Sequence, residues 1–357
     1  MPLSKISATA MVLLGMTLFL LAGSAMAADP VSVVMRQAWI TGGKYAPMYI
    51  ALDKGWYAAQ GLKPTIQRGH GSAAESKTLA AKQADYVFEV DTGTLIRARA
   101  AGAKIKEVGM VYGKYPVTLV SVIDPSTGRP RVATAKDLEG KSLAFSAGSM
   151  HDAMWPAFVK EAGIDKEKVK VVYMKGSEAY VPALLAGTVD AIFGFYSSED
   201  AVAAVTANKM GKKLNFLSWA KVGPRFANFY SNGMIVRDED IENRPKVVAA
   251  VVQETFRGFA YCMQHFNECV DVLHKYHPVL TREVSEMQLS QQLDAVQSLE
   301  AIENGLGFMR KDKMEYTTHM INEVFKHDPP VRAEDVYTNQ FIKKIPLPAD
   351  YAKWSQL

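Results

Sequence analysis

The sequence predicts an α/β protein of two lobes with a ligand cleft between them. Residues 31–123 alternate apolar strand segments with amphipathic helical segments, which is the pattern of a sheet covered by helices. A second alternating unit spans 137–207, and the chain from 245 onward is mostly helical. The strand expected at 229–236 returns toward the first unit, so the chain is expected to cross twice between the lobes.

Each element follows from local patterning, with Gly61 and Gly102 as helix stop signals. In the first unit we expect helices at 48–60, 73–82 and 94–101 and strands at 31–38, 63–67, 86–89, 104–111 and 117–123. In the second unit we expect helices at 150–162, 178–185 and 199–207 and strands at 142–145, 169–173 and 191–195. The C-terminal helices are expected at 245–266, 270–274, 282–304 and 313–325.

The lobe limits are set by composition. A polar turn at 124–131 (DPSTGRPR) is rich in proline and glycine, and it indicates a loop near the first crossing. We therefore predict a discontinuous first lobe of 28–123 plus 228–357, with the C-terminal helices packed on it. The second lobe is predicted to span 124–227.

Residues 1–27 have the form of a cleavable secretory signal. Lys5 precedes an apolar run at 11–21, and Ala25-Met26-Ala27 forms a small-residue cleavage site before Ala28. The apolar run is too short for a membrane span, which needs about 20 residues, and no lipid-attachment cysteine follows it. We therefore predict a soluble periplasmic protein without a membrane anchor, and we expect a monomer.

Composition and motifs argue against several classes of function. The formal net charge of +4 is small and evenly spread, which does not indicate nucleic-acid binding. No HExxH, Walker, G-x-S-x-G or CxxC motif is present, so no catalytic residues and no cofactor are expected. His274 and His277 have no third ligand nearby, so no metal is expected either.

Cys262 and Cys269 fall in a helical stretch expected over 245–274, about 10.5 Å apart along its axis. Because that is beyond disulfide reach, we expect two free thiols.

The candidate ligand contacts lie where strands end and helices begin. Trp39 ends the first strand and offers a large flat face. The turns 71–72 and 146–149 each precede a helix, where free backbone N–H groups suit an anionic group or a ring carbonyl. Serine and glutamate also cap helices for structural reasons alone, and that alternative stays open. The candidate contacts are Trp39, Gly71, Ser72, Asp91, Thr92, Ser146, Ala147, Gly148, Ser149, Tyr196 and Glu199.

Four local patterns together resemble a known family of binding proteins. They are AxxKGWYxxxGL at 51–62, HGSAAESKTLAAKQADYVF at 70–88, DLEGKSLAFSAGS at 137–149 and LLAGTVDAIFGFYSSED at 184–200. In this order and spacing they are similar to periplasmic solute-binding proteins of ABC importers. The similar branch includes the binders of thiamine pyrimidines, riboflavin, sulfonates and nitrate. The resemblance covers nearly the whole mature chain and implies the type II periplasmic binding fold.

The resemblance implies a receptor that closes on a small planar heteroaromatic nutrient, pyrimidine-like or flavin-like. Such a receptor delivers its ligand to an inner-membrane permease that an ATPase powers. Trp39 would stack on the flat ring, and Glu199 would accept a hydrogen bond from a ring amino group. Tyr45 is a further candidate contact, because it stands where the pyrimidine binders often have histidine.

Three alternatives to this receptor stay open. One is a receptor for a sulfonate or another small organic anion, which relies on the two helix N-termini. Another is an enzyme similar to the fungal thiamine-pyrimidine synthase. The third is a receptor that feeds a sensor kinase instead of a permease.

Overall fold

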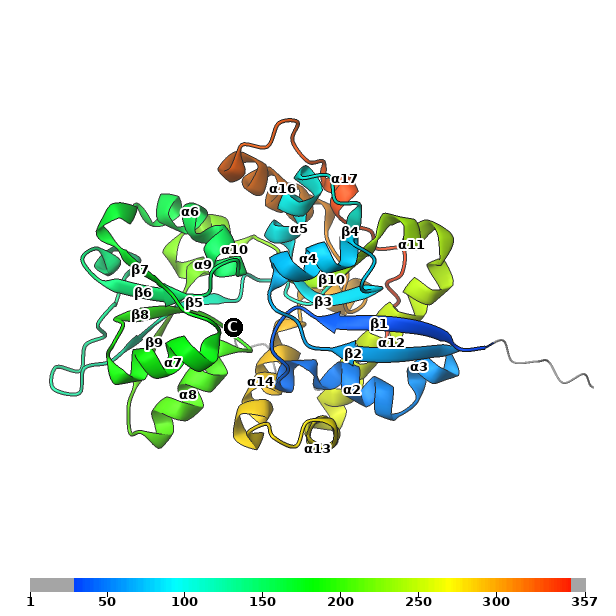
Figure 1. The fold of residues 1–357 in the computed structure, drawn as a ribbon, viewed down its shortest axis with the longest axis horizontal. Coiled ribbons are helices and arrows are strands. Elements are labelled where there is room, and N and C mark those ends of the chain that lie inside the picture. Colours follow the sequence, from blue (N-terminus) through cyan, green and yellow to red (C-terminus); the bar gives the residue numbers. More distant parts are fainter. Residues whose placement is uncertain (1–28, 348–357) are drawn as a thin grey trace, which may run out of the picture.

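The computed structural model describes residues 29–347 and contains two five-stranded sheets, one in each lobe (Figure 1). The predicted secretory signal at 1–27 lies outside the described residues. The sheet of the first lobe has the order β2-β1-β3-β10-β4, in which β1 runs parallel to β2 and β3 while β10 is antiparallel to β3 and β4. Its strands are β1 (Val31–Gln37), β2 (Leu62–Gln67), β3 (Tyr86–Asp91), β4 (Ile105–Met110) and β10 (Asn232–Arg237).

The sheet of the second lobe has the order β7-β6-β8-β5-β9. Its strands are β5 (Val117–Val122), β6 (Ser142–Phe145), β7 (Lys170–Tyr173), β8 (Ala191–Phe195) and β9 (Leu214–Ser218). We predicted the strand at 117–123 as the last of the first lobe, but β5 pairs with β8 and β9 in the second sheet. The chain therefore first crosses between the sheets at 111–116, before the polar turn at 124–131, and it returns at 219–231.

Helices cover both sheets. In the first lobe, α4 and α5 lie on one side of the sheet and α2 and α3 on the other, with α12 and α13 packed against α2 (Figure 1). The first-lobe helices are α2 (Ala46–Asp53), α3 (Trp56–Ala59), α4 (Ser72–Ala80), α5 (Thr92–Ala100), α11 (Asp238–Asn243), α12 (Pro245–Gln264), α13 (Phe266–Tyr276), α14 (Arg282–Ala295), α15 (Leu299–Asn304), α16 (Lys311–Phe325) and α17 (Ala333–Val336). The helices of the second lobe are α6 (Met150–Ala162), α7 (Ser177–Ala186) and α8 (Glu199–Lys209), and the return crossing contains α9 (Trp219–Val222) and α10 (Pro224–Ala227). The short 3-10 turns are η1 (Gly43–Tyr45), η2 (Ala135–Leu138) and η3 (Lys166–Lys168).

Some of the predicted helices are divided in the structure. Gly55 adopts a left-handed conformation with φ of 69° and separates α2 from α3, where we predicted one helix over 48–60. Glycine takes this conformation without steric cost, so a break there is favourable. Similarly, Ser298 caps α15 by accepting a hydrogen bond from the Ala301 amide, which divides the helix predicted over 282–304.

Aromatic side chains fill the region where the chain passes between the lobes. Tyr115 lies on the first crossing and packs against Trp219, Phe226 and Phe229 of the second, with ring centroids 5.2–5.5 Å apart. All of these rings are buried, and Trp219, Phe226 and Phe229 have almost no exposed surface. Dense packing here joins the two crossings into one connecting region between the lobes.

The prediction of free thiols was wrong, because Cys262 and Cys269 form a disulfide. The expected helix breaks at His265, whose φ of −128° and ψ of 48° are not helical, so α12 ends and α13 begins in a new direction. The turn brings the two Cα atoms to 5.7 Å, which is within the range for a disulfide. Both cysteines are fully buried in the first-lobe core.

Removal of this disulfide should destabilise the protein. The double variant Cys262→Ala/Cys269→Ala frees a short loop in the unfolded state, and we expect a loss of roughly 2 kcal/mol in the free energy of unfolding. Urea unfolding of the variant and of the oxidised wild type measures the difference. Equal midpoints and equal slopes would contradict the expectation.

Candidate ligand-binding cleft

A pocket lies between the lobes, with about 400 Å³ of open space including its mouth. Its walls combine the ends of β1, β3 and β10 and the start of α4 with the start of α6 and the loop between β8 and α8. The lining residues are Ala38, Trp39, Lys44, Gly71, Ser72, Glu89 and Asn232 from the first lobe and Ser149, Met150, His151, Phe195, Ser198 and Glu199 from the second.

Trp39 and Glu199 meet across this pocket from opposite lobes. The Trp39 Nε1–H donates to Glu199 Oε1 over 3.0 Å, and Tyr180 of α7 donates its hydroxyl to the same oxygen over 2.8 Å. Glu199 is 2% exposed and is the first residue of α8, where the helix dipole favours a negative charge. Burial raises the pKa of Glu199, while the charge of Lys44 and the hydrogen bonds from Tyr180 and Trp39 oppose that shift.

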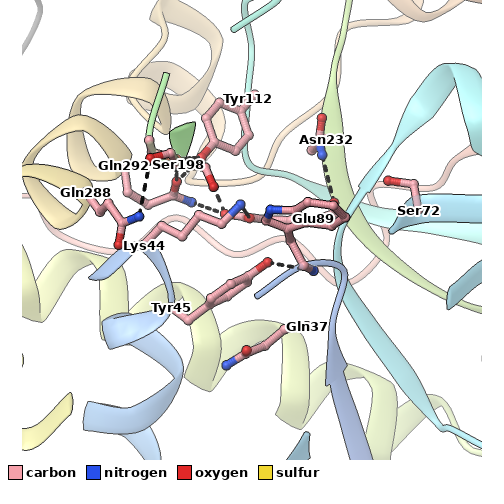
Figure 2. A network of polar contacts seen from close by, with 12 residues as sticks. Gln37, Lys44, Tyr45, Ser72, Glu89, Tyr112, Ser198, Asn232, Gln288 and Gln292 are labelled. Carbon is pink, nitrogen blue, oxygen red and sulfur yellow. Dashed lines mark hydrogen bonds and ion pairs between the residues drawn. The ribbon is translucent and has the colours of Figure 1, made fainter. Parts of the chain in front are cut away.

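A buried ion pair forms the first-lobe side of the pocket. Lys44 of η1 is 4% exposed, and its Nζ lies 2.7 Å from Glu89 Oε2 (Figure 2). The Lys44 ammonium also lies 4.9 Å from the centre of the Phe195 ring of the second lobe. Glu89 has a φ of 69°, an unfavourable conformation for a residue with a side chain, and such strain is concentrated at functional sites. Burial raises the pKa of the Glu89 carboxyl, and Lys44 opposes the shift.

Helix α14 connects this ion pair to the second lobe (Figure 2). Gln292 donates to Glu89 Oε1 over 2.5 Å, and its own Oε1 accepts from the Ser197 hydroxyl over 2.9 Å. Gln288 accepts from the Gly43 amide over 2.8 Å and donates to the Ser198 carbonyl over 3.4 Å. The loop before α8 is thus held to the first lobe by two glutamines one helical turn apart.

Some of the predicted contacts lie on the pocket wall and others do not. Those on the wall are Trp39, Gly71, Ser72, Ser149 and Glu199. Gly71 lies at the cleft, since a Cβ there would be 3.6 Å from the Trp39 ring and 3.8 Å from the Gly148 carbonyl of the other lobe. Those outside the wall lining are Tyr45, Asp91, Thr92, Ser146, Ala147, Gly148 and Tyr196.

The residues outside the lining have structural partners. Tyr45 is fully buried, and its hydroxyl accepts from the Trp39 amide over 3.1 Å, so it supports the Trp39 backbone. Asp91 caps α5 by accepting from the Thr94 amide over 2.7 Å. The Ser146 hydroxyl accepts from the Gly176 amide over 3.0 Å. For these residues the capping or core interpretation fits the structure, and contact with a ligand stays a prediction.

The remaining outer residues divide between buried and open positions. The Thr92 hydroxyl donates to the Ser231 carbonyl inside the first lobe. Tyr196 is half-buried and donates to Asp294 of α14 over 3.4 Å. Ala147 and Gly148 are exposed at the turn before α6.

Sequence reasoning missed Lys44 and Glu89, because charged residues normally occupy the surface. His151 is a further residue of the pocket wall that was not among the candidates, and it is 5% exposed. Burial lowers the pKa of His151 to about 4, so the ring is neutral at physiological pH. Among the described residues, its Nε2 has no hydrogen-bond partner. One signal was available: Lys44 lies in the glycine turn directly after Trp39.

The fold and the cleft agree with comparisons to known proteins. A family model described as NMT1/THI5 like matches residues 43–269, which is more than half of the chain. The chain belongs to the NMT1/THI5-like family. This match begins after β1 and spans the lysine turn, the other four strands of the first sheet and the whole second sheet. The structural neighbours below confirm the two-lobed α/β fold class.

Relatives of the NMT1/THI5-like chain include named binding proteins. The riboflavin-binding protein RibY from Chloroflexus aurantiacus is 21% identical over 323 residues, which cover 87% of this chain and 86% of RibY. The alkanesulfonate-binding protein SsuA from Xanthomonas axonopodis pv. citri superposes with a TM-score of 0.62 at 15% identity, covering 87% of this chain and all of that one. SsuA from Escherichia coli gives a TM-score of 0.64 at 14% identity, covering 87% and 99%. These relatives are described as binding proteins, not enzymes.

Residues 29–347 contain neither a candidate membrane span nor a candidate metal site. No helix in that range combines the length and apolar character that a bilayer crossing requires. The same residues hold no group of three or more histidine, cysteine, aspartate or glutamate side chains arranged to bind a metal ion.

Proposed function

We propose that this protein is the extracytoplasmic receptor of an ABC importer and binds a small planar heteroaromatic nutrient. The observation that carries the proposal is the meeting of Trp39 and Glu199 across one pocket, a flat aromatic face beside a buried acceptor. The name of RibY supports a flavin-like or pyrimidine-like ligand. The chain acts as a periplasmic monomer that hands its ligand to an inner-membrane permease and its ATPase, and no reaction is involved.

Binding follows from the placement of the two residues in different lobes. The ligand stacks on Trp39, donates a hydrogen bond to Glu199, and so links the lobes as they close about the hinge. Tyr45 keeps Trp39 in place through its bond to the Trp39 amide. The lobe limits of this receptor fall within the two crossings, 111–116 and 219–231, which supply the hinge.

An anion receptor is the main rival, and two observations favour it. The α4 and α6 N-termini both reach the pocket, and the SsuA relatives are described as sulfonate-binding proteins. The charges of the pocket argue against it. Glu89 and Glu199 both line the wall, and the Lys44 ammonium is already paired with Glu89. An anion would therefore be placed among carboxylates, which is costly in a buried site.

The substitution Glu199→Gln separates the two candidates. We expect it to weaken a heteroaromatic ligand at least tenfold, because a neutral amide is a poorer acceptor than a carboxylate. The same change should raise the affinity for an anion, because it removes a repulsive charge. Isothermal titration with riboflavin, an aminopyrimidine and taurine measures both effects. Glu178→Gln, on the exposed first turn of α7, is the matched control and should change neither. Taurine binding with no heterocycle binding would overturn the proposal.

A further inference from the structure

We propose that the ligand carries a lactam edge, a ring C=O beside a ring N–H, and that Lys44 and Glu199 recognise this edge together. The inference rests on the proposed function and narrows it to pyrimidinone-type, pyrimidinedione-type and flavin-type rings. It assigns Lys44, which was not among the candidates expected from the sequence, as the residue that determines ligand specificity on the first lobe.

The Lys44 ammonium has hydrogen-bonding capacity that the protein does not use. An ammonium carries three N–H donors. Among residues 29–347, its single oxygen partner is Glu89 Oε2 at 2.7 Å, and its other close neighbours are the Tyr45 and Phe195 rings. The side chain is 4% exposed and lines the pocket, so water satisfies these donors poorly. A ligand oxygen placed in the pocket would satisfy one of them, because a buried donor without a partner is costly.

Glu199 supplies the complementary acceptor from the opposite lobe. The hydrogen bonds from Trp39 and Tyr180 both end on Oε1. No side chain of the described residues donates to the second oxygen, Oε2, so this oxygen is available to a ligand N–H. Lys44 and Glu199 line the same pocket from opposite lobes. The Lys44 ammonium lies 4.9 Å from the centre of the Phe195 ring, and Phe195 ends β8 just before the loop that leads to Glu199.

A lactam edge is the simplest group that satisfies both partners. A sulfonate offers acceptors to Lys44 but nothing to Glu199, and an aminopyrimidine offers donors to Glu199 but only a weakly basic ring nitrogen to Lys44. In a lactam edge the ring C=O accepts a hydrogen bond from Lys44 while the adjacent ring N–H donates one to Glu199. Since Lys44 belongs to the first lobe and Glu199 to the second, the ligand edge also joins the lobes in the closed form.

Two planar tricyclic probes isolate the contribution of this edge. Lumichrome carries a pyrimidinedione ring with N–H groups, and phenazine has a similar flat area without any lactam. We expect wild-type protein to bind lumichrome at least tenfold more tightly than phenazine by quenching of tryptophan fluorescence. Trp39→Ala should weaken both probes by a similar factor, because it removes the stacking face and not the lactam contacts.

Lys44→Met should reduce the preference for lumichrome to about twofold or less while phenazine binding stays. Because Lys44→Met leaves Glu89 buried without its cation, the variant Lys44→Met/Glu89→Gln removes both charges and keeps the test valid if the single variant fails to fold. Lys82→Met, which removes an exposed first-lobe lysine, is the control and should keep the wild-type preference.

The possible outcomes separate this inference from the proposed function. Loss of the preference in a folded Lys44 variant supports the inference. Equal binding of lumichrome and phenazine by wild type, or an unchanged preference in the Lys44 variants, overturns the lactam inference but leaves a heteroaromatic receptor. If neither probe nor riboflavin nor an aminopyrimidine binds, the proposed function itself fails.

Discussion

Replacing Trp39 with alanine should weaken heteroaromatic binding by 10- to 100-fold. Stacking of a base on an aromatic side chain contributes about 1–3 kcal/mol by alanine substitution, which is roughly 5- to 150-fold in affinity, and the expected loss lies within those limits. Trp39 lines the pocket, and the Tyr45 hydroxyl holds its backbone amide in place, so its ring is already ordered before the ligand arrives. Isothermal titration of wild type and variant with the same heterocycle measures the loss.

Two further variants make this result specific. Trp39→Phe keeps an aromatic face but cannot donate to Glu199, so we expect it to retain most of the affinity. Trp56→Ala removes a half-buried tryptophan of α3 that stacks under the Arg257 guanidinium at 4.0 Å, outside the pocket. That variant should lose stability and keep its affinity. Unchanged affinity in Trp39→Ala would show that the ligand does not stack on Trp39.

Replacing Asp200 with asparagine should make the stability of the protein less dependent on pH. Asp200 is 3% exposed, and its two carboxyl oxygens lie 2.8 and 2.9 Å from the Thr118 hydroxyl. Burial raises the pKa of Asp200 to about 8, and the neighbouring Glu199 charge adds to the shift. A Cβ at Gly194 would lie 1.9 Å from Asp200 Oδ1, so the site has no room for a solvating water there.

The sign of the effect follows from proton linkage. Between about pH 4 and pH 8 the folded protein holds a proton on Asp200 that the unfolded chain has lost, so stability falls as pH rises toward 8. Over pH 5 to 8.5 this amounts to roughly 4 kcal/mol of the free energy of unfolding. An asparagine side chain can still form a hydrogen bond with the Thr118 hydroxyl, but it does not titrate. The pH dependence of stability that Asp200 causes should therefore disappear.

Urea unfolding at pH 5 and pH 8.5 tests the Asp200 prediction. The wild type should lose roughly 4 kcal/mol more than Asp200→Asn between the two pH values. Asp271→Asn is the control, because Asp271 is a surface residue with 63% side-chain exposure, and it should follow the wild type. Parallel curves for wild type and Asp200→Asn would show that Asp200 ionises normally in the folded protein.

Much of the fold could be predicted because its strands are continuous apolar runs. The strands at 142–145 and 191–195 have the same limits in the structure as in the prediction. β9 was missed because it is an edge strand with a half-exposed pattern, Leu214–Ser218, and gives no strong periodic signal. β5 was found but assigned to the wrong sheet, because local patterning does not say which strands pair.

The errors in the C-terminal helices and in the pocket have a different origin. The helix end expected at 266 is close to the observed break at His265, but no glycine or proline lies between the two cysteines to indicate that the chain changes direction there. The break accompanies tertiary packing and the disulfide. Lys44 and Glu89 are acceptable inside the protein only because they pair with each other over 45 positions of sequence. Hydropathy treats each of them alone and therefore places both at the surface.

Trp39 and Glu199 were predicted as candidates because each lies at a junction of strand and helix. Such junctions lie at the carboxyl ends of strands, which face the cleft in open α/β sheets. The same rule also selected Asp91 and Ser146, whose side chains instead cap α5 and hold the Gly176 amide. Sequence position thus predicted the edge of the sheet but not which side chains turn toward the pocket.

The most direct test is native mass spectrometry of the purified protein, which is unfolded, refolded and then offered an equimolar mixture of candidate ligands. The mixture holds riboflavin, lumichrome, an aminopyrimidine, taurine and an aliphatic sulfonate. The account predicts that a planar heterocycle is bound at one equivalent, and that Trp39→Ala loses it. A protein that takes up only the sulfonates, with Trp39→Ala unaffected, would contradict the account.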